Sequence, residues 1–199
     1  MQEIFNGIYQ RNAWRGASVS GPGSSGDACA ALIERLPAIF KRLEVKSLLD
    51  IPCGDYNWMR RVDLSGVQYI GADIVGELVE RTRKQHGGGS AEFMRLDITE
   101  SDLPACDMVF CRDCLPHFSF ADIRRAVANI LRSGCRYVAA TTFTERKQNS
   151  DVVTGGWRPL NMAIDPLCFG EPLEIINENL TGQHADKSIA IWNAEKLKT

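Results

Sequence analysis

Five short, largely apolar segments recur between residues 45 and 143 of this 199-residue chain, and polar or helical stretches separate them. They read VKSLLDI, VQYIGAD, AEFMRLD, CDMVFCR and CRYVAATTF, at 45–51, 67–73, 91–97, 106–112 and 135–143. Runs of this length and composition are typical of strands that are buried on both faces. Because strands that alternate with helices form parallel sheets, we predict a Rossmann-like α/β fold with helices on both faces.

Helical spacing of apolar residues predicts a helix over 28–43, which Pro37 should bend or interrupt. A second helix is expected over 75–86, and a third begins after Ser119, which can cap it, and ends at Gly134. The runs LEIIN (173–177) and SIAIWN (188–193) should close the sheet as an antiparallel hairpin. We therefore predict a mostly parallel seven-stranded sheet in one domain over residues 1–199.

The composition limits the kinds of partner. The formal charge is −2 and the basic residues are scattered, which argues against nucleic acid and anionic lipid. No apolar run approaches the roughly 20 residues that span a bilayer, and the start of the sequence does not resemble a signal peptide. Seven irregularly spaced cysteines indicate a reducing compartment. We expect a cytoplasmic protein, monomer or homodimer, that binds a small molecule and not a membrane.

Acidic residues mark the carboxyl ends of the first four predicted strands: Asp50, Asp73, Asp97 and Asp113. In such sheets, ligands bind beyond these ends. The first turn has one glycine, Gly54, in place of the three of a dinucleotide cradle, so an NAD(P)-dependent oxidoreductase is the weaker alternative. Carboxylates at these places can accept hydrogen bonds from ribose and adenine, which favours an adenosine ligand without a diphosphate.

The segments LLDIPCGDYNWM, YIGADI, FMRLDIT and DMVFCRDCLPHF resemble the class I S-adenosylmethionine-dependent methyltransferases, from about Val45 to the C-terminus. The resemblance implies S-adenosylmethionine as cofactor. It places the methionine part at the first loop, the ribose at the second-strand acid and the adenine after the third strand, with further contacts beside these; the residues implied are Asp50, Cys53, Gly54, Asp73, Ile74, Asp97, Ile98 and Arg112. Pro52 and Cys53 stand where the family usually has a glycine-containing start of the loop.

A narrower resemblance is to bacterial and viral methyltransferases that look like glycan-modifying enzymes and share D-I-P-C-G-D, C-R-D-C-L and T-G-x-W-R-P-L-N. It implies O-methylation of a hydroxyl on a sugar or glycan. A phosphonate or phosphate oxygen, or an amine, would be methylated with the same cofactor features and remains an alternative.

Two segments outside the strands are candidates for closing the site. The N-terminal segment 1–27 contains SVSGPGSSGD and is interpreted either as a lid over the cofactor or as a flexible linker. Its predicted cofactor contacts are Trp14, Ser20, Gly21, Gly23 and Ser24. The segment 144–172 is too long for a routine connection and is interpreted as an acceptor pocket, or alternatively as a surface loop. Its predicted acceptor contacts are Arg146, Trp157, Arg158 and Asn161.

His117 is the predicted catalytic base, because imidazole transfers protons near neutrality and the residue follows the fourth strand. Asp113 either orients His117 or contacts the cofactor. The alternative for His117 is a structural residue at a helix start. Another alternative is a zinc-binding interaction module built from Cys106, Cys111, Cys114 and His117. We predict no metal site, because the strand phase should turn these cysteines in different directions.

Overall fold

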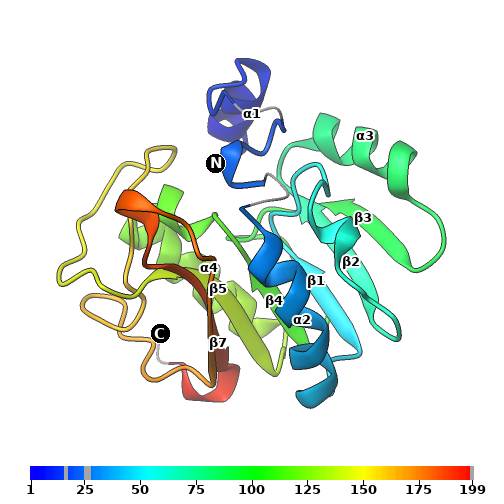
Figure 1. Cartoon of the computed structure of the whole chain (residues 1–199). Coiled ribbons are helices and arrows are strands. Elements are labelled where there is room, and N and C mark those ends of the chain that lie inside the picture. Colours follow the sequence, from blue (N-terminus) through cyan, green and yellow to red (C-terminus); the bar gives the residue numbers. More distant parts are fainter. Residues whose placement is uncertain (16–17, 25–27, 198–199) are drawn as a thin grey trace.

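A computed structural model of the protein describes residues 1–15, 18–24 and 28–197 (Figure 1). Its seven-stranded sheet has the order β3-β2-β1-β4-β5-β7-β6. Strands β1 to β5 run parallel to their neighbours, whereas β7 is antiparallel to both β5 and β6. The strand bounds are β1 Ser47–Asp50, β2 Gln68–Asp73, β3 Ala91–Arg95, β4 Met108–Cys111, β5 Tyr137–Phe143, β6 Glu174–Asn177 and β7 Lys187–Asn193. The predicted fold class and all seven predicted strands are confirmed.

The α-helices are α1 Gln2–Gln10, α2 Ala30–Arg42, α3 Gly76–His86 and α4 Phe120–Arg132. Single 3₁₀ turns are η1 Pro22–Ser24, η2 Met59–Arg61, η3 Leu115–His117, η4 Gly182–His184 and η5 Ala194–Lys196. The predicted cap of α4 is confirmed, since the Ser119 hydroxyl accepts a hydrogen bond from the Asp122 amide at 3.2 Å. Pro37 lies inside α2 without interrupting it. Helix α1 was not predicted.

The sheet is covered on both faces, because successive side chains along each strand enter different cores. Val109 and Cys111 of β4 pack with α4 on one face, and Met108 and Phe110 pack with α2 on the other. The long connection 144–172 contains no helix or strand in the described structure, yet its apolar residues complete the first core. These residues are Leu160, Met162, Leu167 and Phe169.

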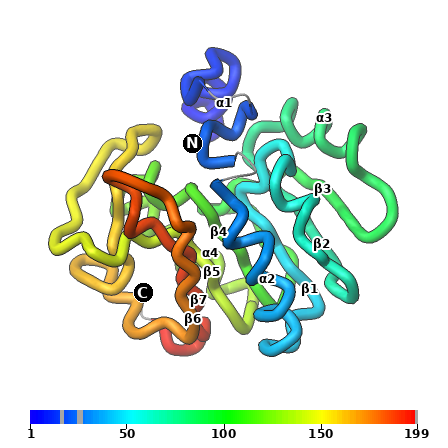
Figure 2. The backbone as a smooth tube through the Cα atoms, in the orientation of Figure 1, coloured from blue at the N-terminus to red at the C-terminus, as the bar shows by residue number. Residues whose placement is uncertain are grey.

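Helix α1 lies beyond the carboxyl ends of the central strands, and the yellow first part of the connection 144–172 lies on the left at the same edge, whereas its orange end runs down the side of the sheet (Figures 1 and 2). Of the two segments predicted to close the site, the N-terminal one and the first part of 144–172 are therefore at the ligand-binding edge. Residues 16–17 and 25–27 of the predicted lid segment lie outside the described residues. In the part of the chain that the structure describes, no helix has the length and apolar character needed to cross a membrane.

Candidate active site

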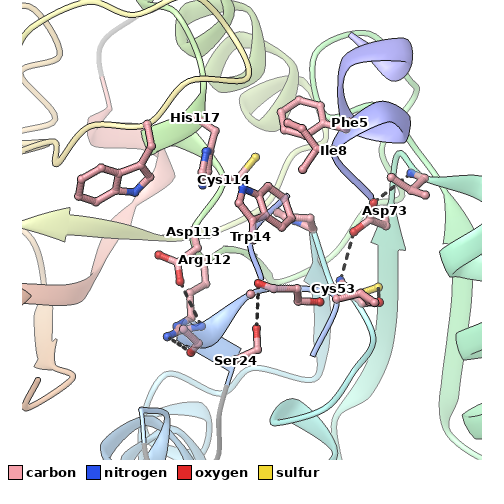
Figure 3. A pocket seen from close by; sticks show the side chains of 18 of the residues that line it. Phe5, Ile8, Trp14, Ser24, Cys53, Asp73, Arg112, Asp113, Cys114 and His117 are labelled. Atoms are coloured by element: carbon pink, nitrogen blue, oxygen red, sulfur yellow. Dashed lines mark hydrogen bonds and ion pairs between the residues drawn. The ribbon is translucent and has the colours of Figure 1, made fainter. Parts of the chain in front are cut away.

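A cavity of about 880 Å³ lies at the carboxyl ends of β1, β2 and β4, under the N-terminal segment (Figure 3). Parallel strands bring their carboxyl ends to one edge, which is why residues distant in sequence meet here. The wall includes every residue predicted to contact the cofactor: Trp14, Ser20, Gly21, Gly23, Ser24, Asp50, Cys53, Gly54, Asp73, Ile74, Asp97, Ile98 and Arg112. Asp113, His117 and Trp157 also line it.

Asp73, at the end of β2, joins the second strand to the first loop. One carboxylate oxygen accepts a hydrogen bond from the Gly54 amide at 3.2 Å, and the other accepts one from the Val75 amide at 3.0 Å. Each oxygen retains a second lone pair that a ligand hydroxyl can use. Burial raises the pKa of Asp73 to about 6, against the effect of the backbone hydrogen bonds.

Asp50, at the end of β1, is the second buried carboxyl group of the wall. It accepts a hydrogen bond from the Tyr69 hydroxyl at 2.7 Å. Burial raises the pKa of Asp50 to about 7, although this hydrogen bond and the charge of Arg112 oppose the shift. Asp50 and Asp73 thus give the cavity two carboxyl groups whose ionisation responds to the charge of a ligand.

The loop 18–24, part of the predicted lid segment, is joined to the first-strand loop by hydrogen bonds to Asp55. The hydroxyls of Ser18 and Ser20 donate to the two carboxylate oxygens of Asp55, at 2.7 and 3.2 Å. The Asp55 amide donates back to the Ser20 hydroxyl at 3.1 Å, and the Asn57 side chain donates to the Ser24 carbonyl at 2.8 Å. Neither Asp55 nor Asn57 was predicted as a site residue. An acid directly after Gly54 was the signal in the sequence that could have found Asp55.

Four charged side chains, of which only Asp113 is partly exposed, form a network between the loop 18–24 and the C-terminal hairpin. Arg112 donates to both carboxylate oxygens of Glu178, at 3.1 and 2.6 Å, and to the Gly23 carbonyl at 2.8 Å. Lys187 bridges Glu178 and Asp113 at 3.3 and 2.7 Å. Burial alone would raise the pKa of Asp113, but Arg112 and Lys187 lower it to about 2. The two positive and two negative charges balance one another.

Glu178 and Lys187 were missed as site residues because the terminal hairpin was interpreted only as the edge of the sheet. Asp113 bonds to Lys187 and lies 3.3 Å from Arg112. The network therefore assigns Asp113 a position beside the cations, not the role of hydrogen-bond partner to His117.

His117 ends η3 and lies on the upper wall of the cavity in Figure 3, near Trp14. Its Nδ1 lies 2.8 Å from the Gly156 carbonyl, and its ring centroid lies 5.4 Å from that of Trp14. A carbonyl oxygen only accepts, so Nδ1 carries the proton and Nε2 holds the lone pair. Burial lowers the pKa of His117, opposed by the Gly156 hydrogen bond and the charge of Asp113. A neutral imidazole with a free Nε2 can remove a proton from a ligand.

The structure separates the residues predicted to contact the acceptor. Trp157 lines the cavity, but Arg146, Arg158 and Asn161 do not. Arg146 donates to the Gln183 carbonyl at 2.7 Å, and Asn161 donates to the Thr144 and Arg146 carbonyls at 3.3 and 3.0 Å. The Arg158 guanidinium donates to backbone carbonyls of η3. In the structure Arg158 does not stand beside Trp157 on the cavity wall, because irregular backbone uses these polar groups for its own carbonyls.

An aromatic wall that was not predicted stands beside Trp157. The Trp157 ring meets the rings of His184 and Phe143 nearly edge to face, with centroids 5.5 and 6.0 Å apart. Both rings line the cavity, together with Gln183 from the loop between β6 and β7. Trp157 is 46% exposed, so part of its ring is open to a ligand.

The prediction that Cys106, Cys111 and Cys114 turn in different directions was wrong, because all three side chains lie in the first core and the Cys111 side chain contacts that of Cys114. Cys106, Cys111 and Cys114 are free thiols buried in the first core, and burial raises the pKa of Cys106 to about 12. The Nδ1 atom of His117 bonds to the Gly156 carbonyl and not to a cysteine. Within residues 1–15, 18–24 and 28–197, no three histidine, cysteine or acidic side chains are grouped so that they could hold a metal ion.

Comparison with protein families identifies the enzyme class. A family model described as "Methyltransferase domain" matches residues 48–134, which span β1 to the end of α4 and include Asp50, Asp73, Asp97 and Asp113. Residues 48–134 therefore match a methyltransferase domain, and this match supports S-adenosylmethionine-dependent methyl transfer. The matched family does not support the oxidoreductase alternative. A search of curated proteins found no significant match to this chain.

Solved structures with this fold include methyltransferases with bound cofactor or product. Human N-acetylserotonin methyltransferase in complex with SAM has a TM-score of 0.64 and 13% identity, over 96% of this chain and 59% of that one. Magnesium protoporphyrin IX methyltransferase (ChlM) from Synechocystis PCC 6803 with bound SAM has a TM-score of 0.62 and 13% identity, over 96% and 93%. PigF with SAH has a TM-score of 0.66 and 14% identity, over 96% and 62%. This chain spans about three fifths of the length of the human enzyme and of PigF. These likenesses confirm the Rossmann-like class I methyltransferase fold.

Proposed function

We propose that this methyltransferase O-methylates a hydroxyl group of a neutral sugar or glycan, with His117 as the base. The observation that carries the proposal is the hydrogen bond from His117 Nδ1 to the Gly156 carbonyl at 2.8 Å, which leaves Nε2 as the acceptor edge of a ring in the cavity wall. No described residue hydrogen-bonds to Nε2. A hydroxyl acceptor needs a base of this kind, because its proton must leave as its oxygen bonds to carbon.

S-adenosylmethionine supplies an electrophilic methyl group on a sulfonium. With the cofactor bound, the acceptor oxygen would take this methyl group, and His117 Nε2 would take the hydroxyl proton. The resulting imidazolium is stabilised by the Gly156 carbonyl at Nδ1 and by the charge of Asp113. Asp50, Asp73 and Asp97 would hold the ammonium, ribose and adenine parts of the cofactor.

The charges in the cavity favour a neutral acceptor over a phosphate or phosphonate. Arg146 and Arg158, the cations predicted for an anionic acceptor, do not line the cavity. The cations that do line it among the described residues, Arg112 and Lys187, are already paired with Glu178 and Asp113. An anionic acceptor would therefore have to break buried ion pairs, which costs several kcal/mol.

The aromatic wall favours a sugar among neutral acceptors. Trp157 offers a partly exposed ring, backed by Phe143 and His184, and the nearby Gln183 side chain offers polar atoms. Sugars have apolar faces edged by hydroxyl groups, and an indole face with polar neighbours suits both. We also propose that the chain is one domain, with 1–27 as the cofactor lid and 144–172 as part of the acceptor wall.

The experiment is a methyl-transfer assay with labelled cofactor against three panels of acceptors: neutral sugars, sugar phosphates or phosphonates, and amines. We expect transfer to a hydroxyl of the neutral sugars. His117→Ala should lower the rate by about 10²- to 10⁴-fold, the typical worth of a general base, without weakening S-adenosylhomocysteine binding. His86→Ala, at the end of α3 and outside the cavity wall, is the matched control. Methylation of phosphonates or amines alone, or an active His117→Ala enzyme, would contradict the proposal.

A further inference from the structure

The segment 151–158 clamps the turn that carries His117. The Gly155 amide donates to the His117 carbonyl at 2.8 Å, and the Arg158 amide donates to the Pro116 carbonyl at 3.2 Å. On the far side of His117, the Ser119 amide donates to the Thr154 hydroxyl at 2.9 Å, and the Phe120 amide donates to the Asp151 carboxylate at 2.8 Å. The clamp thus holds the chain before and after His117.

The Arg158 guanidinium is the centre of this clamp. Nη1 donates to the carbonyls of Leu115 and Pro116 at 3.1 and 2.8 Å, and Nε donates to the Ser150 carbonyl at 3.1 Å. The Leu115 carbonyl also accepts from the Phe118 amide at 3.1 Å, whereas the Pro116 carbonyl has both of its hydrogen bonds from Arg158. Arg158 is 5% exposed and its guanidinium lies 5.4 Å from the centroid of the Phe120 ring, which restricts it to this geometry.

The same segment supplies the carbonyl that decides the tautomer of His117. Gly156 lies two residues before Arg158, and its carbonyl accepts from His117 Nδ1 at 2.8 Å. The Arg158 guanidinium joins Ser150, just before the segment 151–158, to the carbonyls of η3. The position of the Gly156 carbonyl relative to the imidazole therefore depends on this guanidinium. Without that carbonyl, the proton is free to occupy Nε2, and the ring then presents a donor to the acceptor hydroxyl instead of a lone pair.

We propose that Arg158 is a positioning residue, which keeps His117 in the Nδ1–H tautomer with its Nε2 lone pair directed to the acceptor. The inference rests on the proposed function for its catalytic consequence, but not for the tautomer itself. The sequence TGGWRPLN then has two roles. Trp157 faces the acceptor, while Gly156 and Arg158 on either side of it hold the base.

The direct test is ¹⁵N NMR of the two ring nitrogens of His117 in the cofactor-bound protein above pH 7, with His117→Ala used for assignment. The wild-type protein should show the Nδ1–H tautomer. Arg158→Gln, which cannot span both carbonyls, should shift the population toward Nε2–H, and Arg158→Lys should do so only in part. Arg124→Gln, an exposed arginine on α4, should leave the wild-type spectrum unchanged.

Kinetics give a second readout. Displacement of a catalytic group by about 1 Å costs on the order of 100-fold, so Arg158→Gln should lower kcat by about 10- to 100-fold and leave the Kd for S-adenosylhomocysteine within about twofold. If Arg158→Gln does not fold, Thr154→Val, which removes the partner of the Ser119 amide, should produce the same changes to a smaller degree. An unchanged tautomer in folded variants overturns the proposal. Loss of activity with an unchanged tautomer also overturns it, whereas an active His117→Ala enzyme refutes the base and not the clamp.

Discussion

Two buried side chains, Asp50 and Asp73, make the charge of the cavity depend on pH. Burial raises the pKa of Asp50 to about 7 and that of Asp73 to about 6 in the cofactor-free protein. A sulfonium and an ammonium are positive, and ribose hydroxyls donate, so a bound cofactor favours the ionised form of both groups. The pKa of each should therefore fall when S-adenosylmethionine binds, and binding should release protons below pH 7.

Release of protons on binding means that affinity rises with pH. Between pH 5.5 and 7.5 we expect the Kd for S-adenosylmethionine to fall by about tenfold, which corresponds to a change of one unit in a single pKa. Calorimetry at several pH values measures both the Kd and the proton release. Asp50→Asn should remove most of this slope, whereas Asp63→Asn, which changes a fully exposed acid, should retain it. A wild-type slope in Asp50→Asn would show that Asp50 stays neutral in the complex.

At the scale of elements, the loop 18–24 packs against the loop that follows β1. They meet at Gly54, whose φ is +56° and whose added Cβ would lie 2.1 Å from Ser20 Oγ and 3.0 Å from Ser20 Cβ. The same glycine donates its amide to Asp73. A side chain at this position would therefore disturb the backbone, the contact with Ser20 and the hydrogen bond to Asp73 together.

Gly54→Ala can be compared with Gly134→Ala, because both glycines have positive φ. Gly134 has φ +74° and no neighbour within 4 Å of an added Cβ, so it reports the backbone cost alone, about 1 kcal/mol. We expect Gly134→Ala to lose about this much unfolding free energy, and Gly54→Ala to lose more because of the contact with Ser20. Only Gly54→Ala should also displace Ser20 and weaken cofactor binding, by about tenfold. Equal Kd values in the two variants, measured by calorimetry, would mean that the lid contact does not contribute to cofactor affinity.

The sequence predicted regular elements better than the contributions of irregular ones. Strand ends could be located from apolar runs, and parallel topology then brought Asp50, Asp73 and Asp97 to one edge, where the structure has them lining one cavity. Helix α1 was missed because a single short amphipathic turn pattern beside a glycine-rich stretch was interpreted as part of a lid. In the connection 144–172, a polar side chain can hydrogen-bond either to a ligand or to backbone carbonyls. The sequence alone does not tell which of the two Arg158 and Asn161 do.

At the scale of the whole molecule, two groups of strands contribute different halves of the cavity wall. The ends of β1, β2 and β3 carry residues predicted to bind the cofactor, and the ends of β4 and β5 with the terminal hairpin carry His117, Phe143 and Lys187. The network of Arg112, Glu178, Asp113 and Lys187 joins the halves and also reaches the lid through the Gly23 carbonyl. Ligand binding at this junction should therefore stabilise the N-terminal segment, the sheet and the hairpin together.

A thermal-shift measurement tests this expectation. A ligand at about 100 times its Kd adds about 2.7 kcal/mol to the unfolding free energy, and each kcal/mol raises Tm by about 2–4 °C in a domain of this size. S-adenosylhomocysteine at that concentration should raise Tm by about 5–10 °C in one cooperative transition. NAD⁺ should produce no shift, because the first loop has one glycine and no pyrophosphate cradle. Two transitions, of which S-adenosylhomocysteine moves only one, would instead show that the hairpin half unfolds independently and that the charged network does not couple it to the cofactor.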